Sequence, residues 1–251
     1  MIPKIIHQIW IQGYENIPPK QKIYHDWCKI INNDFEHILW DEIKIKKLLM
    51  DHFGKNYVDL YDKYTIYVQK SDFARYAILD IYGGIYLDMD MVCRKNMSPF
   101  LQYDFFCTTD TVSIFIKRYL NGILGTKPKH PIFQYIFKNI FNRQANINKN
   151  LYVGHTTGTK LLYDSISEYQ KTTRNNDFSI IDRKYLHPCG PFNRETCPYT
   201  CEDCFVAQAS ASDSSWAPSS IKILNKYLRN IIFIIVLICL LLFFCYGIHR
   251  K

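Results

Sequence analysis

The fold of this 251-residue chain is decided by residues 71–92, which read SDFARYAILDIYGGIYLDMDMV. In residues 71–81 the apolar side chains fall on one face at helical spacing, and Ser71 can cap the helix. The pair Gly83-Gly84 can end it, because glycine tolerates the backbone conformation of a helix C-terminus. Residues 85–92 are mostly apolar and are predicted to form a strand. The stretch therefore predicts a helix, a tight glycine turn and a buried strand in succession.

Two apolar runs before this stretch are also predicted to be strands. They cover residues 4–10 (KIIHQIW) and 35–40 (FEHILW). Between them, Ile23, Trp27 and Ile30 recur at helical spacing after a Pro-Pro pair, which predicts a helix and a β-α-β unit with parallel strands. Further helices are predicted at residues 43–53, 57–68 and 130–141, and weaker strands at residues 105–108 and 178–183. This alternation is typical of α/β folds, in which ligands bind at the carboxyl edge of the sheet.

Length and charge limit the possible functions. With 48% hydrophobic residues, the chain can bury one core of catalytic size. The formal net charge is +8, but no run of Lys and Arg reaches five residues. The charge therefore favours anionic partners such as diphosphates and acidic lipid headgroups, and no nucleic-acid partner is predicted.

Asp88 and Asp90 lie in the predicted strand and are the candidate metal ligands. Side chains alternate along a strand, so Tyr86, Asp88 and Asp90 are expected on one face. Two carboxylates on one face repel each other unless a divalent cation bridges them to a diphosphate, and oxygen ligands suit Mg2+ or Mn2+. An isolated D-x-D is more often a solvated turn, but this one follows an apolar run and a glycine pair. The dinucleotide fingerprint G-x-G-x-x-G is absent, which also favours phosphate recognition through a metal.

Three other residues qualify for the same site. Asp72 and Arg75 lie on neighbouring positions of the predicted helix and can point into one cleft, although a surface ion pair is an equally good reading. Trp10 closes the first predicted strand beside a glycine-containing turn. Its ring can stack on a nucleobase or belong to the core.

A cysteine cluster lies late in the chain, at Cys189, Cys197, Cys201 and Cys204. Its spacing lacks the two C-x2-C pairs of a zinc ribbon. A structural Zn2+ site, two disulfides and free thiols all remain open.

Residues 231–248 (IIFIIVLICLLLFFCYGI) form an uncharged apolar run of 18 residues, which just meets the length needed to cross a bilayer. We expect a single-pass membrane protein with a C-terminal anchor. Basic residues flank the run on both sides, so the side of the membrane that holds the body stays open. The predicted organisation is a catalytic domain over residues 1–217, a basic juxtamembrane linker over 218–230 and a transmembrane helix over 231–248.

Three segments of the chain resemble one known family. They are residues 2–10 (IPKIIHQIW), residues 70–90 (KSDFARYAILDIYGGIYLDMD) and the late pair Ser215-Trp216. Together they are similar to glycosyltransferase family 32, which includes yeast-type α-mannosyltransferases and inositol phosphorylceramide mannosyltransferases and shares its core with the clostridial glucosylating toxins. The resemblance implies an α/β fold of the GT-A type, a Rossmann-like nucleotide-sugar-binding fold, and a retaining transfer.

The resemblance also implies roles for individual residues. The chain departs from the family pattern where a His often precedes the Ser-Trp pair, since residues 208–213 read QASASD. Asp213 is our substitute for that third metal ligand. In this scheme the metal and Arg75 stabilise charge on the departing nucleoside diphosphate. The implied sets are metal ligands Asp88, Asp90 and Asp213; catalytic residues Asp88, Asp90 and Arg75; and donor contacts Trp10, Asp72, Arg75, Tyr86, Ser215 and Trp216.

The expected activity is therefore that of a retaining, metal-dependent glycosyltransferase. The resemblance favours transfer of a hexose, mannose before others, from GDP-mannose or a UDP-sugar to a membrane-associated glycan or glycolipid. Two alternatives stay open. One is a membrane-tethered sugar-nucleotide-binding protein without catalysis, and the other is a metal-dependent nucleotidyltransferase, which needs a further carboxylate that the sequence near the Asp pair does not offer.

Overall fold

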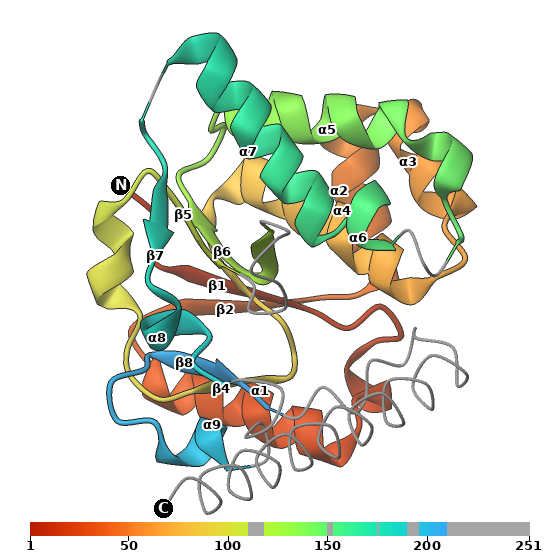
Figure 1. The fold of residues 1–251 in the computed structure, drawn as a ribbon. Helices are drawn as coiled ribbons and strands as arrows, with labels where there is room; N and C mark the ends of the chain where they lie inside the picture. Colours follow the sequence, from red (N-terminus) through yellow and green to blue (C-terminus); the bar gives the residue numbers. More distant parts are fainter. Residues whose placement is uncertain (110–117, 150–152, 175, 190–195, 210–251) are drawn as a thin grey trace, which may run out of the picture. The chain divides into compact units, whose positions relative to one another are not determined.

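The computed structural model describes residues 1–109, 118–149, 153–174, 176–189 and 196–209. Its strands are β1 (Ile5–Ile9), β2 (Glu36–Trp40), β3 (Gly84–Leu87), β4 (Met91–Cys93), β5 (Phe105–Thr109), β6 (Tyr119–Thr126), β7 (Ser179–Ile181) and β8 (Val206–Gln208). Six of them form a mixed sheet in the order β2-β1-β3-β6-β5-β7 (Figure 1), and β4 pairs with β8 in a second sheet. β1 is parallel to β2 and β3, whereas β6 is antiparallel to β3 and β5. The three parallel strands therefore share one carboxyl edge.

Local sequence signals explain several helix ends. The helices are α1 (Pro19–Ile31), α2 (Glu42–Phe53), α3 (Lys55–Lys63), α4 (Tyr67–Tyr82), α5 (Ile132–Asn142), α6 (Val153–Thr156), α7 (Thr159–Thr173), α8 (Arg183–Leu186) and α9 (Cys197–Thr200), with short 3-10 turns at Tyr14–Asn16, Ser98–Gln102 and Gln144–Asn146. Proline occupies the first position of α1, where its missing N–H is not needed. Asp41 caps α2 by accepting a hydrogen bond from Lys44 N at 2.9 Å. Gly83 and Gly84 end α4 with φ values of 64° and 90°, which side chains other than glycine rarely adopt.

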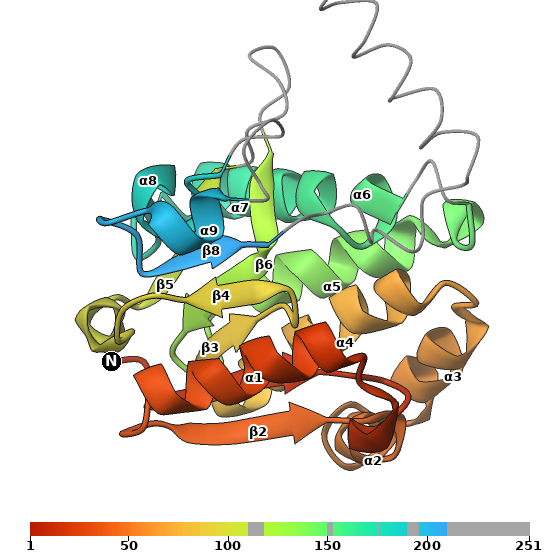
Figure 2. The ribbon, with the colours of Figure 1, turned by 90° about the horizontal axis from the view of Figure 1, so that it is seen from below.

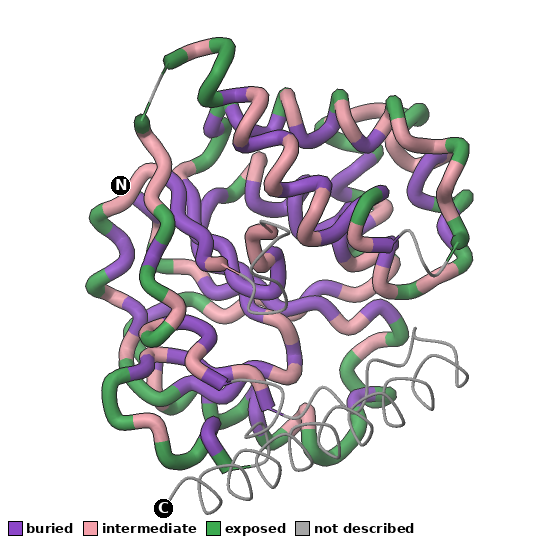
Figure 3. The backbone as a smooth tube through the Cα atoms, in the orientation of Figure 1, coloured by how far each residue is buried: buried purple, intermediate pink, exposed green. Residues whose placement is uncertain are grey.

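Two hydrophobic cores cover the two faces of the large sheet. Alternate side chains of a strand point to opposite faces, so Tyr86 packs against α2 to α5 and α7, whereas Ile85 and Leu87 pack on the side of α1, α8 and the β4–β8 sheet. Figures 1 and 2 show these two groups of helices on opposite sides of the sheet. The buried stretches in Figure 3 follow the strands and the helix faces turned toward them.

Much of the predicted secondary structure is confirmed. The strands expected at residues 4–10, 35–40, 105–108 and 178–183 correspond to β1, β2, β5 and β7. The helices expected at residues 43–53 and 130–141 correspond to α2 and α5. The β-α-β unit is present as β1-α1-β2 with a parallel pair.

The single strand expected over residues 85–92 is wrong. β3 ends at Leu87, and Met91 N then donates to the carbonyl of Asp88 at 3.1 Å, which closes a turn. β4 starts at Met91 and belongs to the other sheet. Asp88 and Asp90 therefore do not lie on one face of a continuous strand, because the chain changes direction between them.

Two helix boundaries also differ from expectation. α4 starts at Tyr67, so Ser71 lies inside the helix, where its carbonyl accepts a hydrogen bond from Arg75 Nε at 3.3 Å. The helix expected over residues 57–68 ends at Lys63 as α3. The early start of α4 has a tertiary cause, since buried Gln69 donates to Thr156 at 2.8 Å and so fixes the first turn.

The apolar stripe of α1 faces outward. Ile23, Trp27 and Ile30 are 65%, 44% and 62% exposed. The buried residues of this helix are Tyr24, His25 and Cys28. The periodic pattern correctly predicted a helix, but the face that contacts the protein is the other one.

The described cysteines form disulfides, with one exception. Cys189 pairs with Cys197, and Cys201 pairs with Cys204, so of the three open alternatives for the cluster the structure has two disulfides. Among the described residues no group of three or more His, Cys, Asp or Glu side chains is arranged to hold a metal ion. The Zn2+ alternative is therefore unsupported, since each of the four sulfurs is already bonded to another. Cys28 on α1 pairs with Cys93 on β4, and buried Cys107 is free.

The C-terminal predictions lie beyond the part of the chain that the structure describes. Residues 210–251 include Asp213, Ser215 and Trp216, the linker over residues 218–230 and the membrane helix expected over residues 231–248, and the structure does not describe them. Within the described ranges, no helix is long and apolar enough to cross a bilayer.

Candidate active site

The candidate residues gather at the carboxyl edge of the three parallel strands. Asp88 directly follows β3, and Trp10 directly follows β1, its neighbour in the sheet. The middle of α4 brings Asp72 and Arg75 to the same place, because α4 leads back along the sheet into β3. This is the edge at which α/β sheets bind ligands.

Arg75 is the centre of the site. Its Nη2 lies 3.0 Å from Asp72 Oδ1 and 3.2 Å from Asp88 Oδ1. Its Nη1 donates to the carbonyl of Asn121 at 2.7 Å, and the guanidinium lies over the Tyr86 ring at 4.5 Å. Only 4% of the side chain is exposed. A planar guanidinium can serve several acceptors in fixed directions, so Arg75 ties α4 to the end of β3 and to β6.

Asp72 is a buried carboxylate with a complete set of partners. Asn121 Nδ2 donates to Oδ1 at 2.8 Å, and Thr157 Oγ1 donates to Oδ2 at 2.9 Å. Burial raises the pKa of Asp72 to about 6, while Arg75 and the two hydrogen bonds favour the ionised form. The Asp72–Arg75 pair is thus a buried ion pair within the site and not a surface pair.

Asp88 is oriented from one side. Tyr86 Oη donates to Oδ1 at 2.7 Å, and among the described residues every side-chain partner of Asp88 contacts this same oxygen. Oδ2 lies against Gly122 of β6, where an added Cβ would come within 2.5 Å of it. The side chain is 30% exposed. Glycine at position 122 therefore leaves room for the Asp88 carboxylate, and within the described residues the side-chain hydrogen bond and ion pair of Asp88 both use Oδ1.

Asp90 lies beyond the turn and contacts the second sheet. Gln208 Nε2 at the end of β8 donates to Asp90 Oδ2 at 2.9 Å, and Ala209 N donates to the Asp90 carbonyl at 2.9 Å. The two carboxylates of the D-x-D motif are thus held from different sides, Asp88 by α4 and β3 and Asp90 by β8.

The residues present fit a divalent cation such as Mn2+ or Mg2+. Two partly exposed carboxylates flank a turn, and carboxylate oxygens are the ligands these cations prefer. Gly122 leaves space for Oδ2 of Asp88 that a Cβ would fill. No third His, Cys, Asp or Glu of the described residues joins the pair in a group that could hold a metal ion, so a third protein ligand, for which Asp213 is the prediction, would come from outside the described ranges.

Trp10 lies at the same sheet edge as Asp88, directly after β1. Its ring is partly exposed, and its Nε1 donates to the carbonyl of Asn16 at 3.0 Å, which fixes the ring beside a 3-10 turn. An indole held in this way offers a flat apolar surface for stacking. The assignment of Trp10 as a base contact stays a prediction.

The polar residues before Trp10 have a structural role. His7 Nε2 donates to the carbonyl of Gly83 at 2.9 Å, and Trp40 Nε1 donates to His7 Nδ1 at 3.1 Å. Gln8 Oε1 accepts from His25 Nδ1 at 2.6 Å. These buried contacts join β1 to the glycine turn before β3 on one face and to α1 on the other.

Sequence reasoning missed four residues of the site. Asn121 and Gly122 belong to β6, which was not predicted as a strand, and Gln208 belongs to the equally unpredicted β8. Thr157 lies in the glycine-bounded run GHTTG at residues 154–158. The two glycines of this run were the only available signal, and they do not reveal the contact of Thr157 with Asp72.

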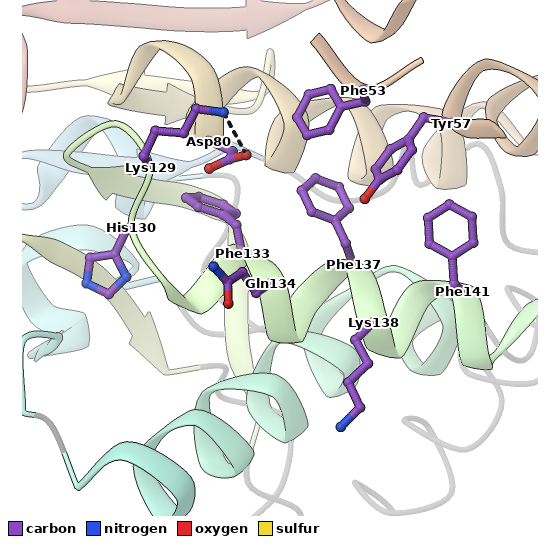
Figure 4. A pocket seen from close by; sticks show the side chains of 10 residues that line it. All are labelled: Phe53, Tyr57, Asp80, Lys129, His130, Phe133, Gln134, Phe137, Lys138 and Phe141. Atoms are coloured by element: carbon purple, nitrogen blue, oxygen red, sulfur yellow. Dashed lines mark hydrogen bonds and ion pairs between the residues drawn. The ribbon is translucent and has the colours of Figure 1, made fainter. Parts of the chain in front are cut away.

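A pocket of about 440 Å³ lies at the other end of α4 (Figure 4). Asp80, on its rim, is about two helical turns beyond Asp72, which is roughly 12 Å along the axis. The Asp80–Lys129 ion pair of 3.4 Å borders one side, and Lys138 extends away from the aromatic rings. The lining residues are Phe53, Tyr57, Asp80, Lys129, His130, Phe133, Gln134, Phe137, Lys138 and Phe141. None of the predicted donor contacts that the structure describes lines it, so this pocket is separate from the described part of the candidate active site.

Comparison with known proteins identifies the family. Residues 18–106 match the family described as "Glycosyltransferase sugar-binding region containing DXD motif". A glycosyltransferase of Acanthamoeba polyphaga mimivirus is 53% identical over 236 residues, which is 92% of this chain and 92% of the viral protein. Inositol phosphoceramide mannosyltransferase 2 of Schizosaccharomyces pombe is 33% identical over 141 residues, but the match covers 56% of this chain and only 39% of the yeast protein.

The solved structure of the PaToxG glycosyltransferase shares the fold. It superposes with a TM-score of 0.50 at 19% identity and covers 68% of this chain and 70% of its own. The mixed sheet, with the D-x-D motif at its carboxyl edge, thus has a GT-A-like glycosyltransferase fold, as predicted. Together with the viral relative, which matches nearly the whole chain, these findings show that the chain belongs to the family of glycosyltransferases whose sugar-binding region contains a DXD motif.

Proposed function

We propose that this protein transfers a hexose, mannose before others, from a nucleotide sugar to an acceptor hydroxyl in a metal-dependent reaction that retains the anomeric configuration. The observation that carries the proposal is the contact of Arg75 with both Asp72 and Asp88 at the sheet edge. Mannose is favoured because matched relatives of Schizosaccharomyces pombe are named inositol phosphoceramide mannosyltransferases.

Asp88 and Asp90 would hold the Mn2+ or Mg2+ ion, which when bound neutralises charge on the donor diphosphate. The protein's own residues contribute three further effects. Arg75 places a buried positive charge beside Asp88, where it stabilises negative charge that develops on a leaving diphosphate. Tyr86 holds the Asp88 carboxylate through its hydroxyl. Asn121 and Thr157 fix Asp72, which keeps Arg75 in place.

A donor screen tests the activity. The full-length protein in detergent would be incubated with GDP-mannose and with several UDP-sugars in the presence of Mn2+, and release of the nucleoside diphosphate would be measured. We expect turnover of one donor, its loss in EDTA, and at least a roughly hundredfold lower kcat for Asp88→Asn and Asp90→Asn. Release of the sugar 1-phosphate, which nucleotidyl transfer from a nucleotide sugar leaves behind, would indicate a nucleotidyltransferase instead. Binding without turnover would indicate a protein that only binds sugar nucleotides.

We further propose that the protein is membrane-anchored and that its acceptor is a membrane-associated glycan or glycolipid. Residues 231–248 supply an uncharged apolar run of 18 residues, and Lys222, Lys226 and Arg229 precede it, where they favour anionic headgroups. The 14 residues from Ala217 to Asn230 span at most roughly 45 to 50 Å, so an anchored domain would work close to the bilayer. The yeast relatives, named for a ceramide-based lipid, support the same acceptor class.

Anchoring and acceptor are tested separately. Deletion from Asn230 onward should release the protein from carbonate-washed membranes without loss of its circular dichroism signal. The full-length protein in liposomes should then glycosylate a lipid acceptor faster than the truncated form does, while both act equally on a soluble headgroup analogue. Equal efficiency of the two forms on both acceptors would contradict the membrane-acceptor proposal but leave the donor chemistry intact.

A further inference from the structure

Gln208 bridges the metal-site turn and a buried histidine. β8 pairs with β4 so that Gln208 lies opposite Met91, next to Asp90. The amide nitrogen of Gln208 donates to Asp90 Oδ2 at 2.9 Å, and its amide oxygen lies 3.0 Å from His187 Nε2. One side chain thus connects Asp90 to a residue on a different element.

The direction of the amide is determined by its two neighbours. A carboxylate accepts hydrogen bonds but does not donate them, so the amide NH2 has to face Asp90. The amide oxygen then faces His187, which must carry its proton on Nε2 in order to donate. His187 is 1% exposed and directly follows α8, so its ring is held by the protein interior. The histidine therefore prevents the glutamine from turning its oxygen toward Asp90.

The charge of the donor also matters. Asp88 faces the cationic guanidinium of Arg75, whereas Asp90 receives the Gln208 hydrogen bond from a neutral amide. A neutral donor orients a carboxylate without cancelling its negative charge. This hydrogen bond therefore weakens the attraction of Asp90 for a cation less than a Lys or Arg in the place of Gln208 would.

We propose that Gln208, oriented by His187, is a positioning residue that holds the Asp90 carboxylate ready for the divalent cation. The inference rests on the proposed role of Asp90 as a metal ligand. Asp90 lies in a turn between two sheets, and the hydrogen bond from Gln208 at the end of β8 helps to fix the direction of its side chain. Loss of such an outer hydrogen bond typically weakens metal binding by about 10- to 100-fold.

The test measures Mn2+ binding to the full-length protein in detergent, without donor, from the electron paramagnetic resonance signal of free Mn2+. Gln208→Met keeps the length of the side chain but removes the amide, and we expect its Kd for Mn2+ to rise about tenfold or more. Gln208→Lys still donates to Asp90 but adds a positive charge, so its loss should exceed that of Gln208→Met. Gln170→Met, the same change at an exposed position of α7, should leave the Kd unchanged.

The histidine is tested by a double-mutant cycle. His187→Leu should weaken Mn2+ binding, His187→Gln should restore part of it because an amide can donate to Gln208, and the double variant His187→Leu with Gln208→Met should bind no more weakly than Gln208→Met alone. Additive losses would show that His187 acts through general stability and would overturn its orienting role.

Two outcomes separate this inference from the proposed function. If Asp90→Asn leaves Mn2+ binding unchanged, the metal assignment itself is wrong. If Asp90→Asn weakens binding but the folded Gln208→Met and Gln208→Lys variants bind Mn2+ like the wild type, the positioning role alone is refuted. In activity assays, Gln208→Met should need more Mn2+ for half-maximal turnover while kcat at saturating Mn2+ stays within a few-fold of the wild type.

Discussion

Nη2 of Arg75 lies 3.2 Å from Oδ1 of Asp88, and this contact joins the helix before the glycine turn to the D-x-D motif after it. The same nitrogen contacts Asp72 at 3.0 Å. A single buried cation therefore balances two carboxylates that would otherwise repel each other. The positions of the Asp72 and Asp88 carboxylates therefore both depend on the positive charge of Arg75.

Arg75→Lys should inactivate the enzyme although it preserves the charge. A lysine ammonium cannot reach Asp72, Asp88 and the Asn121 carbonyl together, because it lacks the planar, forked set of donors. We expect kcat for donor turnover to fall at least about a hundredfold. The matched control is Arg143→Lys, since Arg143 pairs with Asp164 at 2.9 Å between α5 and α7. A folded Arg75→Lys protein with near-wild-type turnover would show that the fork is not needed.

Gly122→Ala should displace Asp88 while the fold persists. The added methyl group would lie 2.5 Å from Asp88 Oδ2 and 3.2 Å from Met91 Cε, so the carboxylate has to move. A misplacement of about 1 Å can lower turnover about a hundredfold. Gly154→Ala is the matched control, because among the described residues its methyl group would meet only Thr159 Oγ1, at 3.7 Å. Steady-state kinetics of both variants measure turnover, and thermal unfolding checks that the fold persists. Unchanged kinetics for Gly122→Ala would contradict the prediction.

The sequence predicted the parts of the fold that local patterns encode. β1, α1 and β2 carry clear apolar runs and periodicity, and Gly83-Gly84 ends α4 as expected. The D-x-D motif and the Asp72–Arg75 pair were predicted because they lie within one continuous stretch of 19 residues, from Asp72 to Asp90. Resemblance to a family supplied the fold type.

What the sequence did not predict depends on contacts between distant segments. β6 contains glycines that look like turn signals, but Gly125 is required because a Cβ would overlap the Phe106 ring of β5. Gly122 is required by Asp88, which lies 34 positions earlier. The break between β3 and β4 follows from the pairing of β4 with β8, more than a hundred residues away. No local propensity reports such constraints.

The outward stripe of α1 gives a direct test of burial. Ile23 is 65% exposed, whereas Ile45 of α2 is fully buried in the core. Ile23→Ala should change the free energy of unfolding by no more than about 0.5 kcal/mol, as is usual for surface positions. Ile45→Ala should lower it by about 2 to 5 kcal/mol, because the substitution leaves a cavity. Denaturant titration measures both values, and a large loss for Ile23→Ala would mean that this face of α1 is covered.

The last prediction concerns His7 and pH. Burial lowers the pKa of His7 to about 4, and the hydrogen bond to Gly83 opposes this effect only in part. The ordinary pKa of histidine is about 6.5. Between these values the unfolded chain binds a proton that the folded protein excludes, so the contribution of His7 to stability is complete above about pH 6.5 and is lost as the pH falls toward 4.

The size of this effect follows from the two pKa values. Between pH 7 and pH 5 the wild type should lose roughly 2 kcal/mol more unfolding free energy than His7→Gln, which does not titrate. The pKa values of His25 and His130 are also lowered by burial, but these residues are present in both proteins and their contributions cancel in the comparison. Denaturant titrations at the two pH values measure the difference, and equal losses would show that His7 is not held neutral.

If His7→Gln does not fold, the imidazole signal of His7 in the wild type provides the second test. It should remain that of the neutral Nε2–H form at pH 5, because Trp40 donates to Nδ1 and Gly83 accepts from Nε2.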